Sequence, residues 1–379
     1  MRIILLINSY IEGLAGGDIW AIENAKRLSL KNDIKVVIVT PQRAAKLWKE
    51  KGLNQCEFII TTKEKKPNLL PLLYFKRILN YFKITFDSDK DDVLFATSIF
   101  FPDIFPLLLL KGKKVAIFHM QAPHPLYGYM IGKTKKIDIK FGNVLNWLNE
   151  KISMSLLKMM NANIFVLTTT KDIVKRYGFS DEQIFTTTNG IDIDFINSIP
   201  EQKKEFDACW VGRPHPQKGL DDLLDIWEKL IKKNNNLKLI LVGPIIHKYK
   251  KIILEKNLEK NVILAGFVSD EEKFIIIKKS KMFISTSYFE SFHIAILEAA
   301  ACNLPIFAYD LPVYKTIYGD NLLYSPIGNK EDMCENIFSY INGDKLIIEK
   351  LNKMQRMVSN HSWEKISDEL IKDIYKIKN

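Results

Sequence analysis

Short apolar runs alternate along the chain with longer stretches in which apolar residues recur every three or four positions. The short runs predict buried strands, and the longer stretches predict amphipathic helices. The predicted strands are Ile3–Ile7, Val36–Val39, Val93–Ala96, Val115–Phe118, Ile164–Leu167, Phe206–Val211, Leu237–Val242, Val262–Leu264, Met282–Ser285 and Ile306–Ala308. The predicted helices include Ile19–Leu30, Leu220–Ile231, Asp270–Lys279 and Ile294–Ala301. This alternation is typical of α/β proteins with parallel sheets and crossover helices.

The alternation is interrupted once, by the polar segment Asn197–Glu205. We therefore expect two doubly wound, Rossmann-like domains, residues 1–198 and 199–362, with a ligand cleft between them. A final amphipathic segment, residues 363–379, has helical spacing at Ile366, Leu370 and Ile374. Its spacing is compatible with packing on either domain, and we expect it to pack back on the first.

Composition narrows the class of protein. The chain has 379 residues, of which 47% are hydrophobic and 26% charged, as in globular proteins. Its four cysteines form no CxxC pair, which argues against structural zinc and a disulfide framework and favours a reducing, cytoplasmic compartment. No segment has the roughly 20 apolar residues of a spanning helix. The net charge of +11 favours anionic partners. Net charge alone does not distinguish nucleic acid, membrane surfaces and phosphorylated small molecules.

The strongest chemical signal follows a predicted strand. The polar loop Ser285–His293 leads directly into the helix Ile294–Cys302, and such a helix start offers free N–H groups to an anion. Glu290 lies in the loop, and Glu298 is the one polar side chain of the helix. A carboxylate in so apolar a helix is costly to bury without a partner, and ribose hydroxyls are suitable donors. Alternatively, Glu298 lies at the solvent edge.

In each domain, a glycine-bearing loop follows the first strand. Gly212–Gly219 contains Arg213 and Lys218, which can converge on a pyrophosphate, or else are ordinary cations of a surface turn. In the segment Glu12–Asp18, Gly16 and Gly17 permit close backbone approach to a ligand at a helix start. This segment does not match G-x-G-x-x-G, so a dinucleotide site is not expected.

With these motifs the chain resembles the retaining glycosyltransferases of family 4, which have the GT-B fold. The matching residues occur in the family's order along nearly the whole chain. They are Gly16-Gly17, Asn189-Gly190-Ile191-Asp192, the Gly-Arg-x4-Lys-Gly of Gly212–Gly219, Gly266-Phe267-Val268 and the E-x7-E of Glu290 and Glu298.

The resemblance implies a role for each matching residue. Arg213 and Lys218 would hold the donor diphosphate, and Glu290 would contact the transferred sugar. Glu298 would bind the ribose. The donor would also be held by Gly16, Gly17, Val268, Ser291, Phe292, His293 and Ile294. His119, which ends the strand Val115–Phe118, matches a family histidine near the transferred sugar, although a lone histidine at a strand end is more often structural.

One departure from the family concerns the donor loop. The family's E-S-F-G is here Glu290-Ser291-Phe292-His293. We expect the imidazole to add bulk where the backbone meets the ligand, and so to affect sugar specificity.

The expected function is transfer of a hexose, with retention, from a UDP- or GDP-sugar to a glycan or a lipid-linked acceptor. Cations and a helix N-terminus would stabilise the departing diphosphate, so neither a metal nor another cofactor is expected. No nucleic acid partner is expected. Two rival functions share the fold: a nucleotide-sugar epimerase and a non-catalytic nucleotide-sugar-binding protein.

A further helix is predicted over Leu69–Ile84, with a polar stripe of Lys76, Arg77, Asn80 and Lys83. Such a basic, aromatic helix suits the anionic surface at the inner face of a membrane, where the protein would be peripheral. The alternative is an ordinary helix that covers the sheet.

Overall fold

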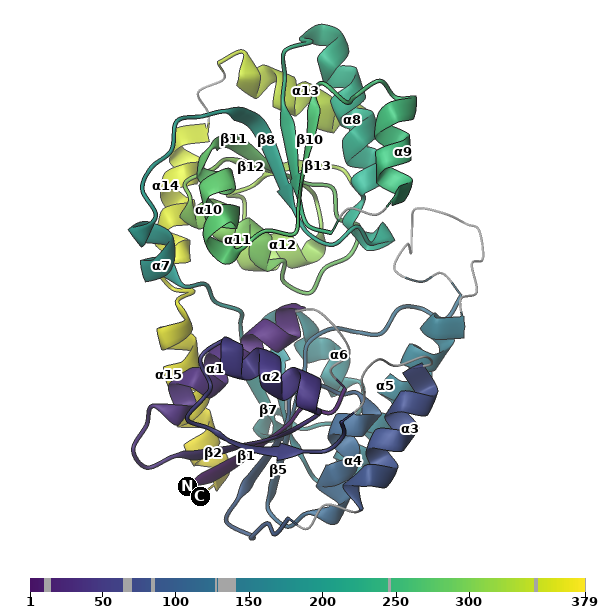
Figure 1. Cartoon of the computed structure of the whole chain (residues 1–379), viewed down its shortest axis with the longest axis vertical. Coiled ribbons are helices and arrows are strands. Elements are labelled where there is room, and N and C mark those ends of the chain that lie inside the picture. Colours follow the sequence, from purple (N-terminus) through teal and green to yellow (C-terminus); the bar gives the residue numbers. More distant parts are fainter. Residues whose placement is uncertain are drawn as a thin grey trace. The chain divides into compact units, whose positions relative to one another are not determined.

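The computed structural model describes residues 1–9, 15–63, 70–82, 86–126, 128, 141–244, 247–343 and 347–378. They form two compact units (Figure 1). The first contains described residues up to 189 together with 363–378, and the second contains those from 190 to 362. The units therefore divide at Asn189–Gly190, ahead of the polar segment at which the sequence suggested a boundary.

The first unit is built on a seven-stranded sheet with the order β3-β2-β1-β4-β5-β6-β7. Every adjacent pair is parallel. The strand order reverses between β1 and β4, which is where open α/β sheets bind ligands. The strands are β1 (Arg2–Leu6), β2 (Lys35–Thr40), β3 (Glu57–Ile60), β4 (Val93–Ala96), β5 (Lys113–Phe118), β6 (Asn163–Leu167) and β7 (Ile184–Thr187).

Helices cover both faces of this sheet, because parallel strands bury side chains on each side. On one face lie α1 (Gly16–Ser29), α2 (Gln42–Glu50) and α15 (Trp363–Lys378). On the other lie α3 (Leu70–Tyr81), α4 (Phe101–Leu109), α5 (Phe141–Met159) and α6 (Lys171–Lys175).

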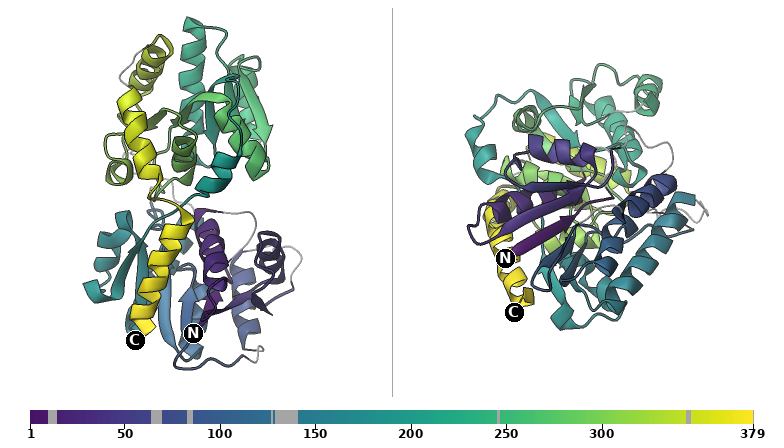
Figure 2. Two further views of the ribbon diagram at one scale, coloured as in Figure 1. Left: turned by 90° about the vertical axis from the view of Figure 1, so that its left-hand side faces the viewer. Right: turned by 60° about the horizontal axis from the view of Figure 1, so that its bottom comes forward.

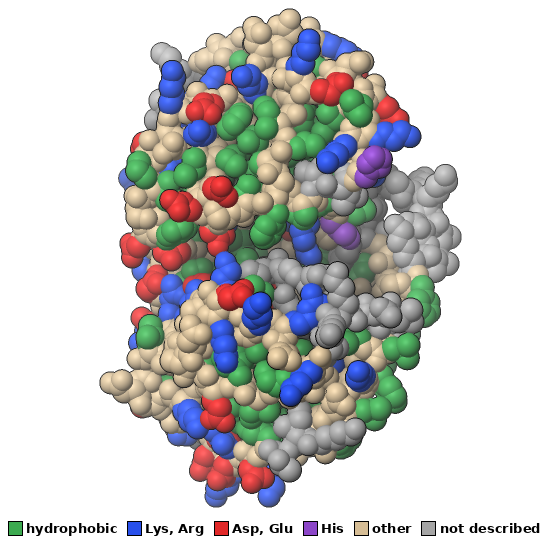
Figure 3. All heavy atoms as spheres, viewed as in Figure 1, with side chains coloured by type: hydrophobic (Ala, Val, Ile, Leu, Met, Phe, Trp, Pro, Cys, Tyr) green, Lys and Arg blue, Asp and Glu red, His purple; other side chains and the backbone are tan. Residues whose placement is uncertain are grey.

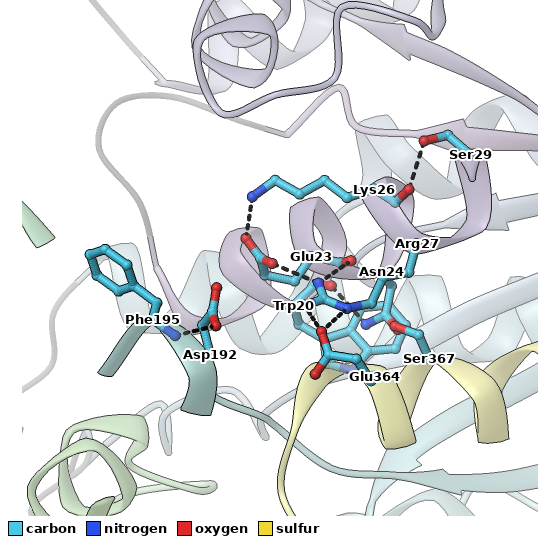
Figure 4. Close-up of polar contacts among 10 residues, drawn as sticks. All are labelled: Trp20, Glu23, Asn24, Lys26, Arg27, Ser29, Asp192, Phe195, Glu364 and Ser367. Carbon is cyan, nitrogen blue, oxygen red and sulfur yellow. Dashed lines mark hydrogen bonds and ion pairs between the residues drawn. The ribbon is translucent and has the colours of Figure 1, made fainter. Parts of the chain in front are cut away.

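The C-terminal helix α15 packs beside α1 (Figure 2). Its buried residues Trp363, Ile366 and Leu370 join the core that α1 shares with the sheet. Polar contacts reinforce the pair: Arg27 of α1 donates to Glu364, and the Ser367 hydroxyl donates to the Asn24 side chain at 2.8 Å (Figure 4). The last residues of the chain thus belong structurally to the first unit.

The second unit has a six-stranded parallel sheet with the order β10-β9-β8-β11-β12-β13. Here the order reverses between β8 and β11. The strands are β8 (Phe206–Val211), β9 (Leu239–Val242), β10 (Val262–Gly266), β11 (Ser280–Ser285), β12 (Ile306–Tyr309) and β13 (Leu323–Ser325). The helices are α7 (Ile193–Ser198), α8 (Leu220–Lys233), α9 (His247–Glu255), α10 (Asp270–Lys278), α11 (Ile294–Ala301), α12 (Pro312–Tyr318), α13 (Lys330–Ile341) and α14 (Ile347–Val358).

The two parallel sheets confirm the predicted pair of doubly wound, Rossmann-like domains. Three strands, β3, β7 and β13, were not predicted, and each lies at the edge of its sheet. An edge strand pairs on one side only and is less fully enclosed, so it tolerates polar residues such as Glu57, Thr186 or Tyr324. Its apolar run is correspondingly weak. Helix α1 also begins three residues before the predicted start at Ile19, so that Gly16 and Gly17 lie in its first turn.

The predicted polar stripe of the helix around Lys76 is wrong in one respect. Arg77 is buried, at 3% exposure, and its guanidinium donates to the carbonyl of Asn8. Burial is possible because the end of β1 supplies this acceptor. Lys76 is exposed, and Lys83 lies outside the described residues.

Candidate active site

The two loops that the sequence singled out in the second unit lie side by side, at the reversal point of the sheet. Residues 212–219 follow β8, and residues 286–293 follow the neighbouring strand β11. The backbone N–H of Tyr288 donates to the carbonyl of Gln217 at 2.7 Å, and the Thr286 hydroxyl donates to the carbonyl of Gly219 at 2.9 Å. These bonds fix the loops to each other at the carboxyl ends of the strands.

Gly219 makes this close approach possible. Its φ is +61°, in the left-handed region, and a Cβ at this position would lie 2.0 Å from the carbonyl oxygen of Thr286. Any other residue would force the loops apart. Gly219 also follows the short 3-10 helix Pro216–Lys218, so it fixes the direction of the Lys218 backbone.

Lys218 and Glu290 form an ion pair across the two loops. The Lys218 Nζ lies 2.7 Å from Glu290 Oε1, and the side chains are 17% and 7% exposed. Burial raises the pKa of the Glu290 carboxyl, but the Lys218 ammonium outweighs it, so the pKa lies below its ordinary value. Glu290 is therefore a carboxylate at neutral pH, held by a cation that is itself suited to phosphate.

Arg213 lies in the same loop but in a different environment. Its side chain is exposed to solvent. Its carbonyl accepts from the N–H of His215 at 2.7 Å, which tightens the turn between β8 and Lys218. The structure thus brings Lys218 to Glu290 and leaves Arg213 at the rim of the loop.

His293 precedes α11 with φ +71° and ψ +73°, a conformation that usually selects glycine. Its ring turns inward and is 4% exposed. Nδ1 lies 2.7 Å from the hydroxyl of Tyr314 and 3.2 Å from that of Ser285. The expectation that this imidazole adds bulk at the ligand face is therefore wrong, because hydrogen bonds hold the ring in the interior.

Burial and, to a smaller extent, the nearby Lys218 charge together lower the pKa of His293 to about 3, against an opposing effect of Glu290. The imidazole is therefore neutral. Its Nδ1 lies 3.8 Å from Glu290 Oε1, but without a proton on the ring this proximity is not an ion pair. Glu290 is left with Lys218 as its charged partner.

The start of α11 is anchored from below. The Tyr318 hydroxyl is 3.3 Å from the carbonyls of both Phe292 and His293 and donates to them, and the Phe292 ring is buried against Tyr318 and His361. Ser291 and Ile294 are half-buried beside it. The first N–H groups of a helix have no partner within it, so this rigid helix start can receive an anion.

Glu298, one turn further along α11, forms an ion pair with Lys273 of α10. The Lys273 Nζ lies 2.7 Å from Glu298 Oε1, and the side chains are 17% and 13% exposed. The carboxylate thus lies neither at an open solvent edge nor without a partner, so its burial alone does not demand a ribose. Lys273 was not predicted. The helical pattern around Lys273 does not indicate a contact with a residue 25 positions away in the sequence. Only the folded chain brings the two side chains together.

Val268 follows β10 in the same unit and is half-buried. The preceding Gly266 accepts at its carbonyl from the N–H of Gly243 at 2.8 Å. Phe267 between them is 89% exposed. An aromatic ring held this far out of the core is unusual, although single exposed apolar residues occur on most proteins.

In the first unit, Gly17 and His119 lie against each other. A Cβ on Gly17 would come within 3.0 Å of the His119 ring, which also packs edge-on against Trp20. His119 Nε2 is 3.1 Å from the carbonyl of Thr97, so this nitrogen carries a proton and Nδ1 is left as an acceptor. Burial lowers the His119 pKa to about 4. Gly16 is exposed, and Glu12–Leu14 lie outside the described residues.

A buried carboxylate at the reversal point of this sheet was not predicted. Asp103 accepts from the backbone N–H groups of Asn8 and Ser9 and from the hydroxyls of Ser9 and Ser98. Burial raises its pKa to about 6, while these bonds oppose the shift. It ties the end of β1 to the loop after β4. No local pattern reveals this role, because Asp103 lies in an apolar stretch far from Asn8 in the sequence.

Two kinds of feature are absent from the described residues. No group of three or more His, Cys, Asp or Glu side chains in these ranges has the arrangement of a metal site. Nor does any described helix combine the length and apolarity needed to cross a membrane.

The chain is similar to known glycosyltransferases, and a family model matches most of its second unit. Residues 192–361 match the family model for glycosyl transferases group 1. A poly(ribitol-phosphate) alpha-N-acetylglucosaminyltransferase of Staphylococcus aureus is 25% identical over 81% of this chain and 59% of its own length. An uncharacterized glycosyltransferase of Methanocaldococcus jannaschii is 23% identical over the whole of this chain and 99% of its own.

Solved structures show the same fold. TarM of S. aureus, in complex with fondaparinux, alpha-GlcNAc-glycerol and UDP, superposes with a TM-score of 0.74 at 17% identity, covering 100% of this chain and 99% of that one. HepE of Anabaena with UDP-glucose gives 0.72 at 14% identity, covering 99% and 100%. The chain therefore has the GT-B fold, as predicted.

Proposed function

We propose that the chain is a retaining hexosyltransferase of family 4 that takes a sugar from a nucleoside diphosphate sugar. The observation that carries the proposal is the Lys218–Glu290 pair beside the N-terminus of α11. It combines a cation for the diphosphate, a carboxylate for sugar hydroxyls and backbone N–H groups for developing negative charge. UDP is favoured over GDP as the carrier, because the TarM and HepE structures contain UDP or UDP-glucose.

In the proposed reaction the departing diphosphate gains negative charge as the bond to the anomeric carbon breaks. Lys218, Arg213 and the N-terminal N–H groups of α11, near Ser291, Phe292, His293 and Ile294, stabilise that charge, so we propose that no metal is required. Diphosphate binding draws Lys218 away from Glu290, whose carboxylate then accepts hydrogen bonds from the sugar. With retention, the departing phosphate takes the proton of the acceptor hydroxyl.

The other predicted residues complete the donor site. Glu298 accepts hydrogen bonds from the ribose hydroxyls, which replace part of its interaction with Lys273. Val268 contacts the base through its backbone. We also assign Gly16 and Gly17 to diphosphate binding, and the unprotonated Nδ1 of His119 to accepting a hydrogen bond from a hydroxyl of the transferred sugar. The acceptor is a glycan or a lipid-linked glycan. The free state of all four cysteines is in keeping with a cytoplasmic site.

The proposal is tested with the purified full chain and a panel of UDP- and GDP-sugars, with glycan and lipid-linked acceptors. Transfer with retention is expected from one donor. Glu290→Gln should lower kcat by about 100-fold or more, because its bonds to the sugar strengthen in the transition state. Glu298→Gln should mainly raise the donor KM, by about tenfold, because a ribose bond is made equally before and during reaction.

The outcome also separates the rival functions. If an isomerised nucleotide sugar formed without any acceptor, the protein would be an epimerase and not a transferase. Donor binding without turnover of any sugar would indicate a binding protein. Unchanged kcat in Glu290→Gln would contradict the proposed site.

A further inference from the structure

The outer face of α3 is apolar where a helix on a soluble protein is ordinarily polar. Leu72, Phe75 and Leu79 are 66%, 60% and 46% exposed, and Phe82, directly after the helix, is 63% exposed. Their spacing of three or four positions places them on one side of the helix. Isolated exposed apolar residues are common, but a row of four large ones on one helix side is not.

The inner face of α3 shows the reverse arrangement. Arg77 is buried and bonded to the carbonyl of Asn8, and the Tyr74 hydroxyl donates to the carbonyl of Ser9 at 3.1 Å. These contacts fix the rotation of α3 about its axis. The helix therefore cannot turn its apolar side inward without breaking a buried guanidinium bond, so the exposure is a property of the fold.

Helix α5 carries a second exposed apolar row. Phe141, Leu148, Ile152 and Met159 are 74%, 41%, 52% and 70% exposed. Successive members are two turns, one turn and two turns apart, so they share one side of the helix.

The two rows face the same side of the unit. Helices α3, α4 and α5 all pack on one face of the sheet, through Tyr81, Ile104, Leu107, Met154 and Leu157. Helix α4 contacts both α3 and α5 (Figure 1). Apolar side chains gather along this part of the surface of the unit in Figure 3. We call this surface, defined by Leu72, Phe75, Leu79, Phe82, Phe141, Leu148, Ile152 and Met159, the α3–α5 face.

The exposed charges on helices α3, α4 and α5 themselves have one sign. The acidic residues of α3, α4 and α5 are Asp103 and Glu150, and both are buried. The exposed charged side chains of these helices are Lys76, Lys151 and Lys158. The sequence from Lys65 to Phe86 contains no Asp or Glu at all. Helices that expose apolar rows and lysines but no carboxylate of their own are complementary to a layer of apolar chains beneath anionic headgroups.

We propose that the α3–α5 face docks on an anionic lipid bilayer, with its leucine, isoleucine and phenylalanine side chains inserted at the headgroup level and its lysines at lipid phosphates. The α3–α5 face belongs to the first unit, whereas the Lys218–Glu290 pair belongs to the second. This docking does not rest on the proposed transfer reaction, and its test needs no turnover.

The test measures co-sedimentation of the full chain with phosphatidylcholine vesicles that contain or lack phosphatidylglycerol. The wild type should bind the anionic vesicles. The triple variant Leu72→Gln, Phe75→Gln, Leu79→Gln should bind about 100-fold more weakly, because three large side chains no longer leave water. A matched control, Leu30→Gln with Leu254→Gln, changes leucines that are 73% and 58% exposed elsewhere and should bind as the wild type does.

Hydrogen exchange gives a second readout that does not depend on the variants. Amides of α3 and α5 should exchange more slowly when anionic vesicles are added, while those of α9 in the second unit should not change. Equal binding of the wild type and the triple variant would overturn the proposal. So would wild-type dimers that the triple variant abolishes without any vesicle binding, since the face would then be an interface between copies. Equal binding to neutral vesicles would overturn the anionic requirement.

Discussion

The imidazole of His293 and the hydroxyl of Tyr314 form a buried hydrogen bond, with Nδ1 and Oη 2.7 Å apart. The bond joins the residue before α11 to helix α12. It holds a non-glycine residue in the left-handed region, a conformation that is otherwise unfavourable by roughly 1 kcal/mol. The backbone that leads from Glu290 into the helix is thereby kept in the shape that the proposed donor site needs.

Removal of that hydroxyl should destabilise the second unit. Tyr314→Phe leaves the His293 ring with Ser285 as its remaining polar partner, and we expect a loss of about 1–3 kcal/mol in the free energy of unfolding. Tyr324→Phe is the control, because its hydroxyl donates to the carbonyl of Gly319 at an exposed position, where the loss should stay below about 1 kcal/mol. Denaturant unfolding measures both. Equal losses would mean that the buried bond has no special importance.

Acid should destabilise the second unit through His293. The folded-state pKa of about 3 lies below the value of the unfolded chain, so protonation favours unfolding. The stability is fully present above about pH 6.5 and is lost as the pH falls, by about 2 kcal/mol between pH 6.5 and pH 5. Glu290, whose pKa is also lowered, changes stability in the same direction at lower pH.

A matched variant isolates the histidine. Asparagine tolerates the left-handed conformation and does not titrate in this range. The free energy of unfolding of His293→Asn should therefore fall by about 2 kcal/mol less than that of the wild type over the same interval. Parallel pH profiles for the two proteins would show that His293 is not the group responsible.

The Lys218–Glu290 pair should matter differently for stability and for activity. Lys218→Met leaves a buried carboxylate without its cation and should cost about 2–4 kcal/mol. The double variant Lys218→Met, Glu290→Gln removes the charge as well and should recover most of that loss, yet it should stay inactive. Thermal unfolding and donor turnover of the singles and the double form the test. Recovery of activity with stability would assign the pair a structural role only.

Gly219 should tolerate no side chain. Gly219→Ala places a Cβ against the carbonyl oxygen of Thr286, so we expect a loss of about 2 kcal/mol or more together with displacement of Lys218 and reduced turnover. Gly178 has a φ of +83° and meets only the end of the Lys158 side chain, at 3.9 Å. Gly178→Ala should therefore cost about 1 kcal/mol, from the backbone conformation alone. A smaller loss in Gly219→Ala than in this control would contradict the close-approach explanation.

The sequence by itself determined the class of fold and most of the central strands. Buried parallel strands are enclosed on both faces, so β1, β8 and β11 each contain an apolar run of at least three residues. It also indicated the loops after β8 and β11, because glycine, cations and a helix start leave a local pattern. Three of the four edge strands, β3, β7 and β13, escaped detection because polar residues interrupt their short apolar runs, whereas the fourth, β10, keeps the run Val262–Leu264 and was predicted.

Tertiary structure decided which side chains meet and which way they face. Lys273 reaches Glu298, and Asp103 reaches Asn8, across separations that no local pattern encodes. His293 turned inward because Tyr314 and Ser285 offered it partners, and Arg77 turned inward because the end of β1 offered a carbonyl. A polar side chain follows the hydrogen bonds that its surroundings supply, and those surroundings exist only in the folded chain.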